Sequence, residues 1–452
     1  MAERSRTRGL VAALLTASLM PLNSTMIAVA IPDIARDVGQ DPATVTQALV
    51  ATYLIAAIAL QSPGGKLGDR LGHWRIFTAG QLVIAVGAVV GFVAPSLTLL
   101  AISRILIAVG GAVIVPATVA LLRTELPADR RGRAFGTFGA VMALAAALGP
   151  IVGGGLVDAF GWESLFLANL PVLAVSAVLA AGVAHPVAKA RAASFDWLGS
   201  GLLTAALIVL VVGAQRSDAP TAILLVTAGV VALVPFAWWE RRAPDPVVAF
   251  SLFASRPFLA GTVLIGLNNV VMYALLFELP LVLESRFDQG ARETGQLLLF
   301  LLLAMVVTSL LAGRLADRTG ARVLAVTGSV LSIVAIAMML ASDFTSPGDV
   351  RVPLAVLGVG LGMAGPAAQT ASLSAVSATQ SGMAAGLGST VRYLGGVIGI
   401  AILGRVLDLT DGREAILTEH RLALSIFLAT LMAGLACAAV LPGRRALSRL
   451  SG

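Results

Sequence analysis

The stretch GGKLGDRLGHWRIF, residues 64–77, places a lysine, an aspartate, two arginines and a histidine between two long apolar segments. A second stretch, AGRLADRTGARVL at residues 312–324, repeats the frame G-x-L-x-D-R-x-G. Charge is scarce in the chain, so a charged phrase that recurs at a wide spacing indicates that one structural unit occurs twice. The two copies predict a fold built from two related halves.

The rest of the chain is too apolar for a water-soluble domain. Of its 452 residues, 58% are hydrophobic and 12% are charged, whereas soluble domains carry roughly 25% charged residues. Apolar runs of 18 or more residues recur from one end to the other, and each can cross a bilayer core of about 30 Å. We therefore expect an all-α integral membrane protein, because a helix satisfies its own backbone in lipid.

Fourteen apolar runs qualify as membrane-spanning helices, and short breaks rich in turn residues separate them. The expected helices lie near residues 9–31, 44–64, 76–95, 98–122, 134–156, 164–184, 198–215, 219–238, 257–284, 294–312, 322–342, 352–376, 384–407 and 422–441.

The basic residues give the expected orientation. The formal net charge is +7, but the arginines and lysines sit in short loops and not in a block interleaved with aromatics, which argues against nucleic-acid binding. With a cytoplasmic N-terminus, the inner segments hold 21 of the 31 lysines and arginines and the outer segments hold 8. The positive-inside rule then places both termini in the cytoplasm.

The N-terminus also resembles a secretory signal peptide, with residues 28–30 as a cleavage site. An uncleaved first helix is favoured, because the apolar run is about 22 residues long and many further spans follow. The single cysteine, Cys437, excludes an intrachain disulfide.

The two charged phrases divide the expected helices into groups. The first phrase follows helix two and the second follows helix ten, so an even number of crossings places both in the cytoplasm. We expect an N-terminal six-helix bundle at 1–185, an inserted helix pair with its linkers at 186–256, and a C-terminal six-helix bundle at 257–452. Duplicated bundles are typical of secondary transporters, whose substrate site lies between the repeats near mid-membrane.

The charged phrase predicts a gate between helix ends. Gly65 allows two helices to approach closely, and Gly72 can adopt the left-handed conformation of a tight turn. Asp69 can accept hydrogen bonds from exposed amides or pair with an arginine. The simpler alternative is that Arg70 and Arg75 only set topology, and the second copy of the phrase argues against it. The expected gating residues are Gly65, Asp69, Arg70, Gly72, Asp317 and Arg318.

The fifth run contains a second phrase, ALGPIVGGG at residues 147–155. Glycines let a spanning helix pack closely, and a proline kinks it by removing a hydrogen bond to the preceding turn. Gly149, Pro150, Gly153 and Gly154 therefore predict a bent, tightly fitted helix where two bundles meet, with simple helix packing as the alternative.

Polar side chains inside the apolar runs are candidates for the transport site, because they are costly in lipid. Arg104 costs about 3 kcal/mol unless it is paired or hydrated. Burial suits Glu278 to carrying a proton, and a wet outer vestibule is the alternative for it. The amides have interhelical hydrogen bonds as their alternative. The expected proton-coupling residues are Glu278 and Arg104, and the expected cavity residues are Asn23, Gln61, Asn268, Asn269, Tyr273, Gln369 and Arg392.

Together these phrases resemble the major facilitator superfamily, and within it the fourteen-span drug:proton antiporters. Residues 65–72 match the signature of the loop between helices two and three, and residues 313–320 match its counterpart. The helix-five phrase resembles the exporters' motif, and LNSTMIAVAIP at residues 22–32 resembles the helix-one motif of the fourteen-span group. The resemblance covers nearly the whole chain and implies two six-helix bundles with two inserted helices.

Two departures affect the proton coupling that this resemblance implies. Many family members carry an aspartate in helix one, where this chain has Asn23, so Arg104 lacks the implied acidic partner. In helix four, Ile107 and Ala108 replace the usual Gln-Gly after the arginine. Coupling would then fall to Glu278 or to a protonatable group on the substrate.

The resemblance implies a proton-coupled secondary exporter of small amphipathic or cationic drugs and antibiotics, acting by alternating access as a monomer in a bacterial inner (plasma) membrane. Its partners would be the substrate, protons and the bilayer, without nucleic acid, cofactor or metal. No P-loop occurs in the sequence, so ATP hydrolysis is not expected. The alternatives are an exporter or uniporter of an endogenous lipid or metabolite with weak or no coupling, and a membrane-embedded enzyme. No span has a metal-binding spacing of histidine and glutamate, which argues against the enzyme.

Overall fold

The computed structural model describes residues 2–40, 42–181, 195–214, 216, 218–289, 291–407 and 413–443, and every regular element within them is a helix. In chain order these are α1 (Ala2–Met26), η1 (Ile27–Ala30), α2 (Ile31–Val38), α3 (Pro42–Thr46), η2 (Gln47–Ala51), α4 (Thr52–Leu71), α5 (His73–Phe92), α6 (Leu97–Glu125), α7 (Ala128–Phe160), α8 (Ser164–Leu167), α9 (Asn169–Ala180), α10 (Trp197–Ala214), α11 (Ala219–Glu240), α12 (Ser251–Ala254), α13 (Arg256–Phe287), α14 (Ala291–Thr319), α15 (Ala321–Ala341), η3 (Pro347–Val350), α16 (Arg351–Ser374), η4 (Ala378–Gln380), α17 (Ser381–Val406) and α18 (Arg413–Val440).

Among the described residues, thirteen helices are long and apolar enough to cross a membrane. The first is continuous through α1, η1 and α2, and the second through α3, η2 and α4. The predicted span at 164–184 is instead the shorter helix pair α8 and α9, Ser164–Ala180. Residues 182–194, which include the predicted boundary at 186, lie outside the described part of the chain. The structure therefore supports thirteen of the fourteen predicted spans.

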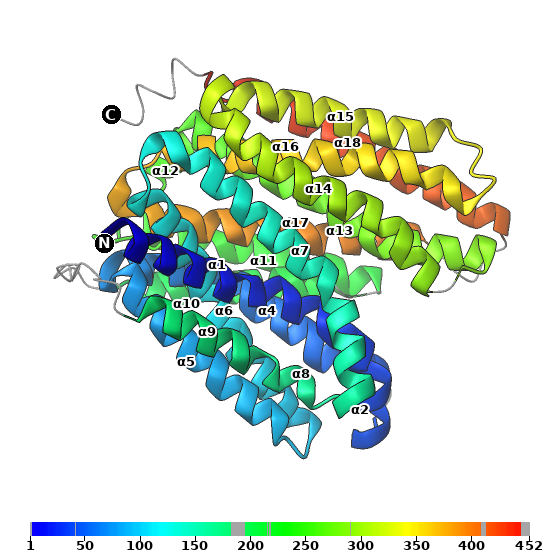
Figure 1. Cartoon of the computed structure of the whole chain (residues 1–452), viewed down its shortest axis with the longest axis horizontal. Coiled ribbons are helices and arrows are strands. Elements are labelled where there is room, and N and C mark those ends of the chain that lie inside the picture. The colour runs from blue at the N-terminus through cyan, green and yellow to red at the C-terminus, as the bar shows by residue number, and fades with distance from the viewer. Residues whose placement is uncertain are drawn as a thin grey trace.

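The helices fall into two groups that meet at one end and diverge at the other (Figure 1). We name residues 2–181 the N-half and residues 251–443 the C-half. In the N-half α1 packs against α6, α7 and α9, and in the C-half α13 packs against α16, α17 and α18. The first helix begins and the last helix ends at the end where the halves meet. We name this end, where α4 ends and α17 begins, the Asp69 face.

The two most extensive helix contacts between the halves are α4 with α17 and α7 with α14, and we name them the α4–α17 seam and the α7–α14 seam. Glycines make both contacts close. A Cβ atom added at Gly65 of α4 would overlap the carbonyl oxygen of Gly382 on α17. A Cβ added at Gly313 of α14 would likewise overlap the carbonyl oxygen of Gly132 on α7. The helices α10 and α11 pack together, and α10 lies against both α4 and α17, so the inserted pair covers one seam.

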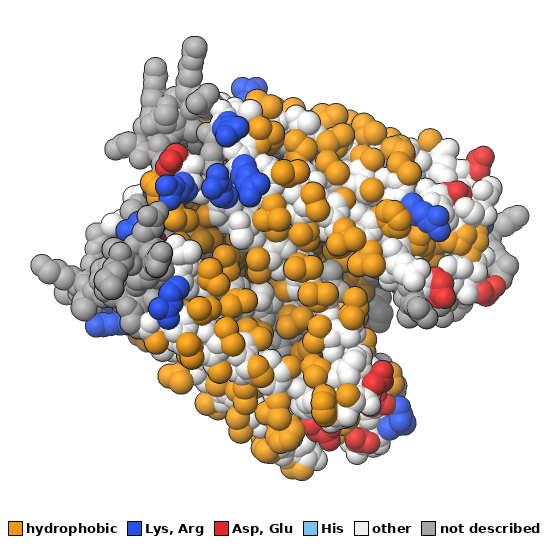
Figure 2. Space-filling model, in the orientation of Figure 1, with side chains coloured by type: hydrophobic (Ala, Val, Ile, Leu, Met, Phe, Trp, Pro, Cys, Tyr) orange, Lys and Arg blue, Asp and Glu red, His pale blue; other side chains and the backbone are white. Residues whose placement is uncertain are grey.

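The surface matches a bilayer environment. Hydrophobic side chains cover the middle of the molecule in Figure 2, while lysines and arginines gather at the Asp69 face and acidic residues at the opposite end. At that opposite end the surface is notched between the two halves. The molecule is therefore closed at the Asp69 face and open at the other.

Candidate functional site

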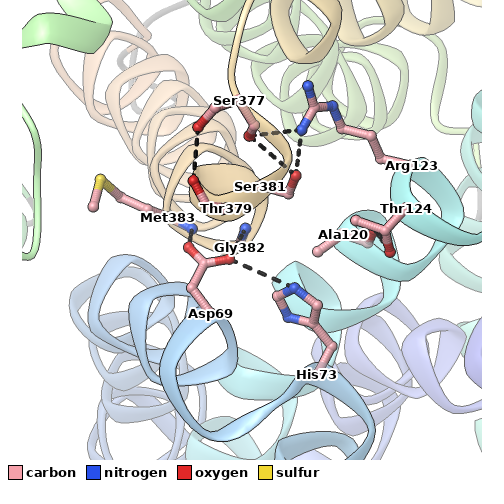
Figure 3. A network of polar contacts seen from close by, with 10 residues as sticks. All are labelled: Asp69, His73, Ala120, Arg123, Thr124, Ser377, Thr379, Ser381, Gly382 and Met383. Carbon is pink, nitrogen blue, oxygen red and sulfur yellow. Dashed lines mark hydrogen bonds and ion pairs between the residues drawn. The ribbon is translucent and has the colours of Figure 1, made fainter. Parts of the chain in front are cut away.

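Asp69 links the two halves at the closed face. It lies in the last turn of α4, which Gly72 ends with a φ of 96°. Its two carboxylate oxygens accept hydrogen bonds from the backbone N–H groups of Gly382 and Met383, each at 2.7 Å, in the first turn of α17 (Figure 3). Free N–H groups and the positive end of the helix dipole make this position favourable for a carboxylate. Asp69 was expected to bind either exposed amides or an arginine, and in the structure it binds the amides.

Arg123, at the end of α6, makes a second link between the halves (Figure 3). Its guanidinium donates to the carbonyl oxygen of Ser377 at 2.8 Å, to the carbonyl oxygen of Val376 and to the hydroxyl of Ser381. These acceptors precede or begin α17, in the C-half. From the sequence, Arg123 is only one of the inner basic residues counted for topology, because an arginine at a helix end carries no sign of a distant acceptor.

Two further predicted gating residues are the arginines that follow the aspartates of the repeated phrase. The side chain of Arg70 is half-buried and that of Arg318 is exposed. Asp317 belongs to α14, but its side chain lies outside the described residues. The gating role of the repeated phrase stays a prediction.

In the N-half, the predicted Arg104 is held by neutral groups. Its Nε donates to the carbonyl oxygen of Leu49 at 3.0 Å and its Nη2 to that of Asn23 at 3.1 Å. Its guanidinium carbon lies 4.2 Å from the ring centroid of Tyr53, a cation–π contact. The Asn23 side chain turns instead to Asn169, whose Oδ1 accepts from Asn23 Nδ2 at 2.6 Å. This cluster carries no acid, so Asn23 and Arg104 do not form a proton-accepting pair.

In the C-half, the predicted Glu278 is fully buried and paired with His420. The Oε1 of Glu278 lies 2.9 Å from the Nδ1 of His420, and among the described residues its Oε2 has no hydrogen-bond partner. Phe344 stacks on the imidazole with the ring centroids 5.2 Å apart, and Arg286 donates from Nε to the Phe344 carbonyl oxygen at 3.2 Å. Full burial excludes the wet vestibule as the environment of Glu278 in this state.

His420 was missed because its helix begins earlier than predicted. Hydropathy placed the last span at 422–441, which left His420 in a loop. The structure begins α18 at Arg413, so His420 lies inside the helix and faces α13.

Arg392 lies where the halves approach each other. It is eleven residues from the start of α17, which places it about 16 Å from the Asp69 face, near mid-membrane. Its Nη2 donates to Gln369 Oε1 at 2.8 Å, and its guanidinium carbon is 5.8 Å from the ring centroid of Phe138 on α7. Tyr273 on α13 packs against Gly396, one turn further along α17. The structure therefore brings Arg392, Gln369 and Tyr273 to one region.

The other predicted cavity amides are not part of that cluster. Asn269 donates to the carbonyl oxygen of Ile265 in its own helix at 2.8 Å. Asn268 is buried, and its Nδ2 has no partner within the described part of the chain. Gln61 is fully buried on α4, with its Nε2 4.0 Å from Met20 Sδ, and its Oε1 likewise finds no partner among the residues that the structure describes.

The helix-five phrase packs within its own half. Cβ atoms at Gly149 and Gly153 would overlap Thr25 and Met26 of the first span, and Pro150 lies within α7. Gly154 has nothing within 4 Å of an added Cβ. Two of the three predicted glycines thus fit tightly against the first span. The contact of α7 with the C-half lies nearer the start of the helix, at Gly132 and Gly136.

The chain is similar to known transporters over most of its length. The profile of the Major Facilitator Superfamily matches residues 13–400. The chain is 32% identical over 410 residues to the uncharacterized MFS-type transporter YvkA of Bacillus subtilis, covering 90% of this chain and 92% of that one. It is 30% identical to the puromycin resistance protein pur8 of Streptomyces alboniger, covering 91% and 83% of the two chains. It is 31% identical to the tetracenomycin C resistance and export protein of Streptomyces glaucescens, covering 85% and 73%.

Solved structures show the same fold. The human organic anion transporter MFSD10 aligns with a TM-score of 0.70 and 16% identity, covering 96% of this chain and 99% of that one. The proton:xylose symporter XylE aligns with a TM-score of 0.70 and 13% identity, covering 98% and 97%. On its sequence, its helices and these relatives, the chain belongs to the major facilitator superfamily, as a multi-pass membrane transporter related to multidrug and antibiotic resistance proteins.

Proposed function

We propose that this chain is a proton-driven exporter that moves small amphipathic or cationic compounds out of the cytoplasm by alternating access. The name of its relative, the tetracenomycin C resistance and export protein, supports export as the direction. The excess of basic residues at the Asp69 face supports a cytoplasmic position for that face and for both termini. The protein would act as a monomer in the bacterial plasma membrane.

The observation that carries the proposal is the pair of hydrogen bonds that Asp69 accepts from backbone N–H groups of α17. These bonds join the halves at one face while the opposite surface is notched. Such an arrangement is one of the two states that alternating access requires, closed inside and open outside. Separation of Asp69 from α17 would begin the opposite state.

The proposed proton-coupling group is the pair of Glu278 and His420. A buried carboxylate beside an imidazole can hold one shared proton, and a buried charge that loses its partner is costly. Arg104 would then have a structural role, because its partners in the structure are carbonyl oxygens and an aromatic ring. Each proton that enters down 100 mV supplies about 2.3 kcal/mol for export.

Ethidium efflux from proteoliposomes with an imposed pH gradient tests both parts. The wild-type protein should move ethidium against its gradient, and an uncoupler should abolish the uphill movement. Glu278→Gln should remove proton-driven efflux and retain downhill exchange, since it lacks the ionisable group but keeps the shape. Glu293→Gln, an exposed carboxylate on α14, is the matched control and should transport normally. Full uphill efflux by Glu278→Gln would overturn the assignment of Glu278.

The alternative within transporters is export or uniport of an endogenous lipid or metabolite with little proton coupling. Growth protection by a panel of toxic compounds in a pump-deficient host separates the two, with and without an uncoupler. Protection that survives the uncoupler favours the alternative. A chemically altered compound in the proteoliposome assay would instead indicate an enzyme.

A further inference from the structure

The segment that follows the inserted helix pair reaches into the closed face. We name residues 243–250, between α11 and α12, the strap. The backbone N–H of Val248 donates to Glu240 Oε1 at 2.6 Å, which fixes the strap to the end of α11. Asp245 forms an ion pair with Lys66 of α4, and the N–H of Ala249 lies 3.2 Å from Met383 Sδ on α17. The strap therefore contacts the inserted pair, the N-half and the C-half.

The strap is also packed as part of the core. Val247 is fully buried, and Val248 and Ala249 expose 3% and 8% of their surface. They belong to the same apolar cluster as Met383 and Phe258. Burial of these apolar side chains holds the strap in one position, because release of the strap would expose Val247 and Val248 to water.

Lys66 and Met383 are the two contacts that give the strap a role at the gate. Lys66 lies one turn before Asp69, and its ammonium is largely buried and paired with Asp245. A buried ammonium needs a partner, because desolvation without one is costly. Met383 donates its N–H to Asp69 at 2.7 Å and receives the strap at its sulfur. One residue of α17 thus connects the strap directly to the hydrogen bonds of the gate.

We propose that the strap ties the closed face together, with Asp245 as a positioning residue that holds Lys66 while Val247, Val248 and Ala249 brace the first turn of α17. Opening this face requires α4 to separate from α17, and the strap then has to release either Lys66 or Met383. The inserted helices thereby take part in the gate instead of only filling space beside it. This inference rests on the proposed closing role of Asp69.

Alkylation of a buried cysteine measures opening of the seam without any cargo. Ser62 of α4 is fully buried beside Gly386 of α17, and Cys437 is the one native cysteine. In the full-length Cys437→Ser protein in nanodiscs, Ser62→Cys should react slowly with N-ethylmaleimide. Asp245→Asn should raise that rate by about fivefold, as expected for loss of a partly buried ion pair. An exposed cysteine, Thr319→Cys, reports the intrinsic rate of the reagent.

A double-mutant cycle separates the ion pair from general loosening. Lys66→Met should raise the rate like Asp245→Asn, and the double variant should match the single ones within about twofold because the two changes break one interaction. Asp129→Asn, an exposed carboxylate at the same face, should leave the rate unchanged. An unchanged rate in Asp245→Asn, or additive effects in the cycle, would overturn the proposal. If Asp69→Asn also leaves the alkylation rate unchanged, the proposed closing role of Asp69 is wrong. If Asp69→Asn raises the rate and Asp245→Asn does not, only the proposed role of the strap is refuted.

Discussion

The α4–α17 and α7–α14 seams have similar glycine contacts but different surroundings. Both bring backbones so close that a methyl group at Gly65 or Gly313 would overlap a facing carbonyl oxygen. The α4–α17 seam adds the hydrogen bonds of Asp69 and the ion pair of the strap, and α10 covers it. Beside the α7–α14 seam, the apolar side chains of Leu310 and Leu311 on α14 are exposed at the surface.

This difference teaches that a duplicated fold need not use its two halves in the same way. Glycine packing by itself has no directional bonds to break. The polar links of the α4–α17 seam are directional and are lost when the helices part, and the strap and α10 lie against the same seam. We infer that the α4–α17 seam, together with the strap and α10, holds the closed state.

The largest expected effect comes from filling the space between the glycines. Gly65→Ala places a methyl group on the Gly382 carbonyl oxygen, and this backbone atom cannot move aside without shifting α17. We expect the closed state to lose about 3 kcal/mol and the Ser62→Cys reporter to react more than tenfold faster.

Two other glycines calibrate that result. Gly313→Ala makes the equivalent change in the α7–α14 seam, where we expect a lower melting temperature with little change in the reporter. Gly154→Ala, with nothing within 4 Å of its Cβ, should leave both unchanged. Equal reporter rates in Gly65→Ala and Gly313→Ala would remove the distinction between the seams.

An intermediate effect is expected from Asp69→Asn. The amide keeps one oxygen acceptor and loses the charge that strengthens both bonds to α17. The closed state should weaken by about 2 kcal/mol, seen as faster alkylation of Ser62→Cys and slower uphill ethidium efflux. Preserved efflux with an unchanged alkylation rate would show that the α4–α17 seam does not depend on its polar links.

The smallest effect is expected where the inserted pair touches the seam. Thr204 of α10 donates to the Ala59 carbonyl oxygen at 3.4 Å, a long and neutral hydrogen bond. Thr204→Ala should change stability by less than about 0.5 kcal/mol, measured as the melting temperature in detergent. A large drop in melting temperature would indicate that α10, and not the strap, holds the α4–α17 seam together.

The fold was largely predictable because hydropathy and the repeated phrase act locally. Runs of apolar residues locate the spans, and Gly72 marks the end of α4 together with the position of Asp69. The identity of α17 as the partner of Asp69 was not predictable, because its two N–H groups lie 313 and 314 residues away.

The parts that sequence analysis missed depend on tertiary contacts. Asp245 looks like a loop residue, yet it pairs with Lys66 across 179 residues. His420 precedes the most apolar part of its helix, so hydropathy excluded it. The amide of Asn23 cannot supply acid chemistry, and its partner Asn169 could not be named from spacing.

The most direct measurement is a pair of distances by double electron–electron resonance in the Cys437→Ser protein. Spin labels at the exposed positions Arg75 and Thr379 report the Asp69 face, and labels at Gln40 and Asp343 report the opposite face. Alternating access predicts that ethidium and a change of pH lengthen the first distance as they shorten the second. Distances that change in the same direction, or an Asp69 face that never opens, would contradict the account.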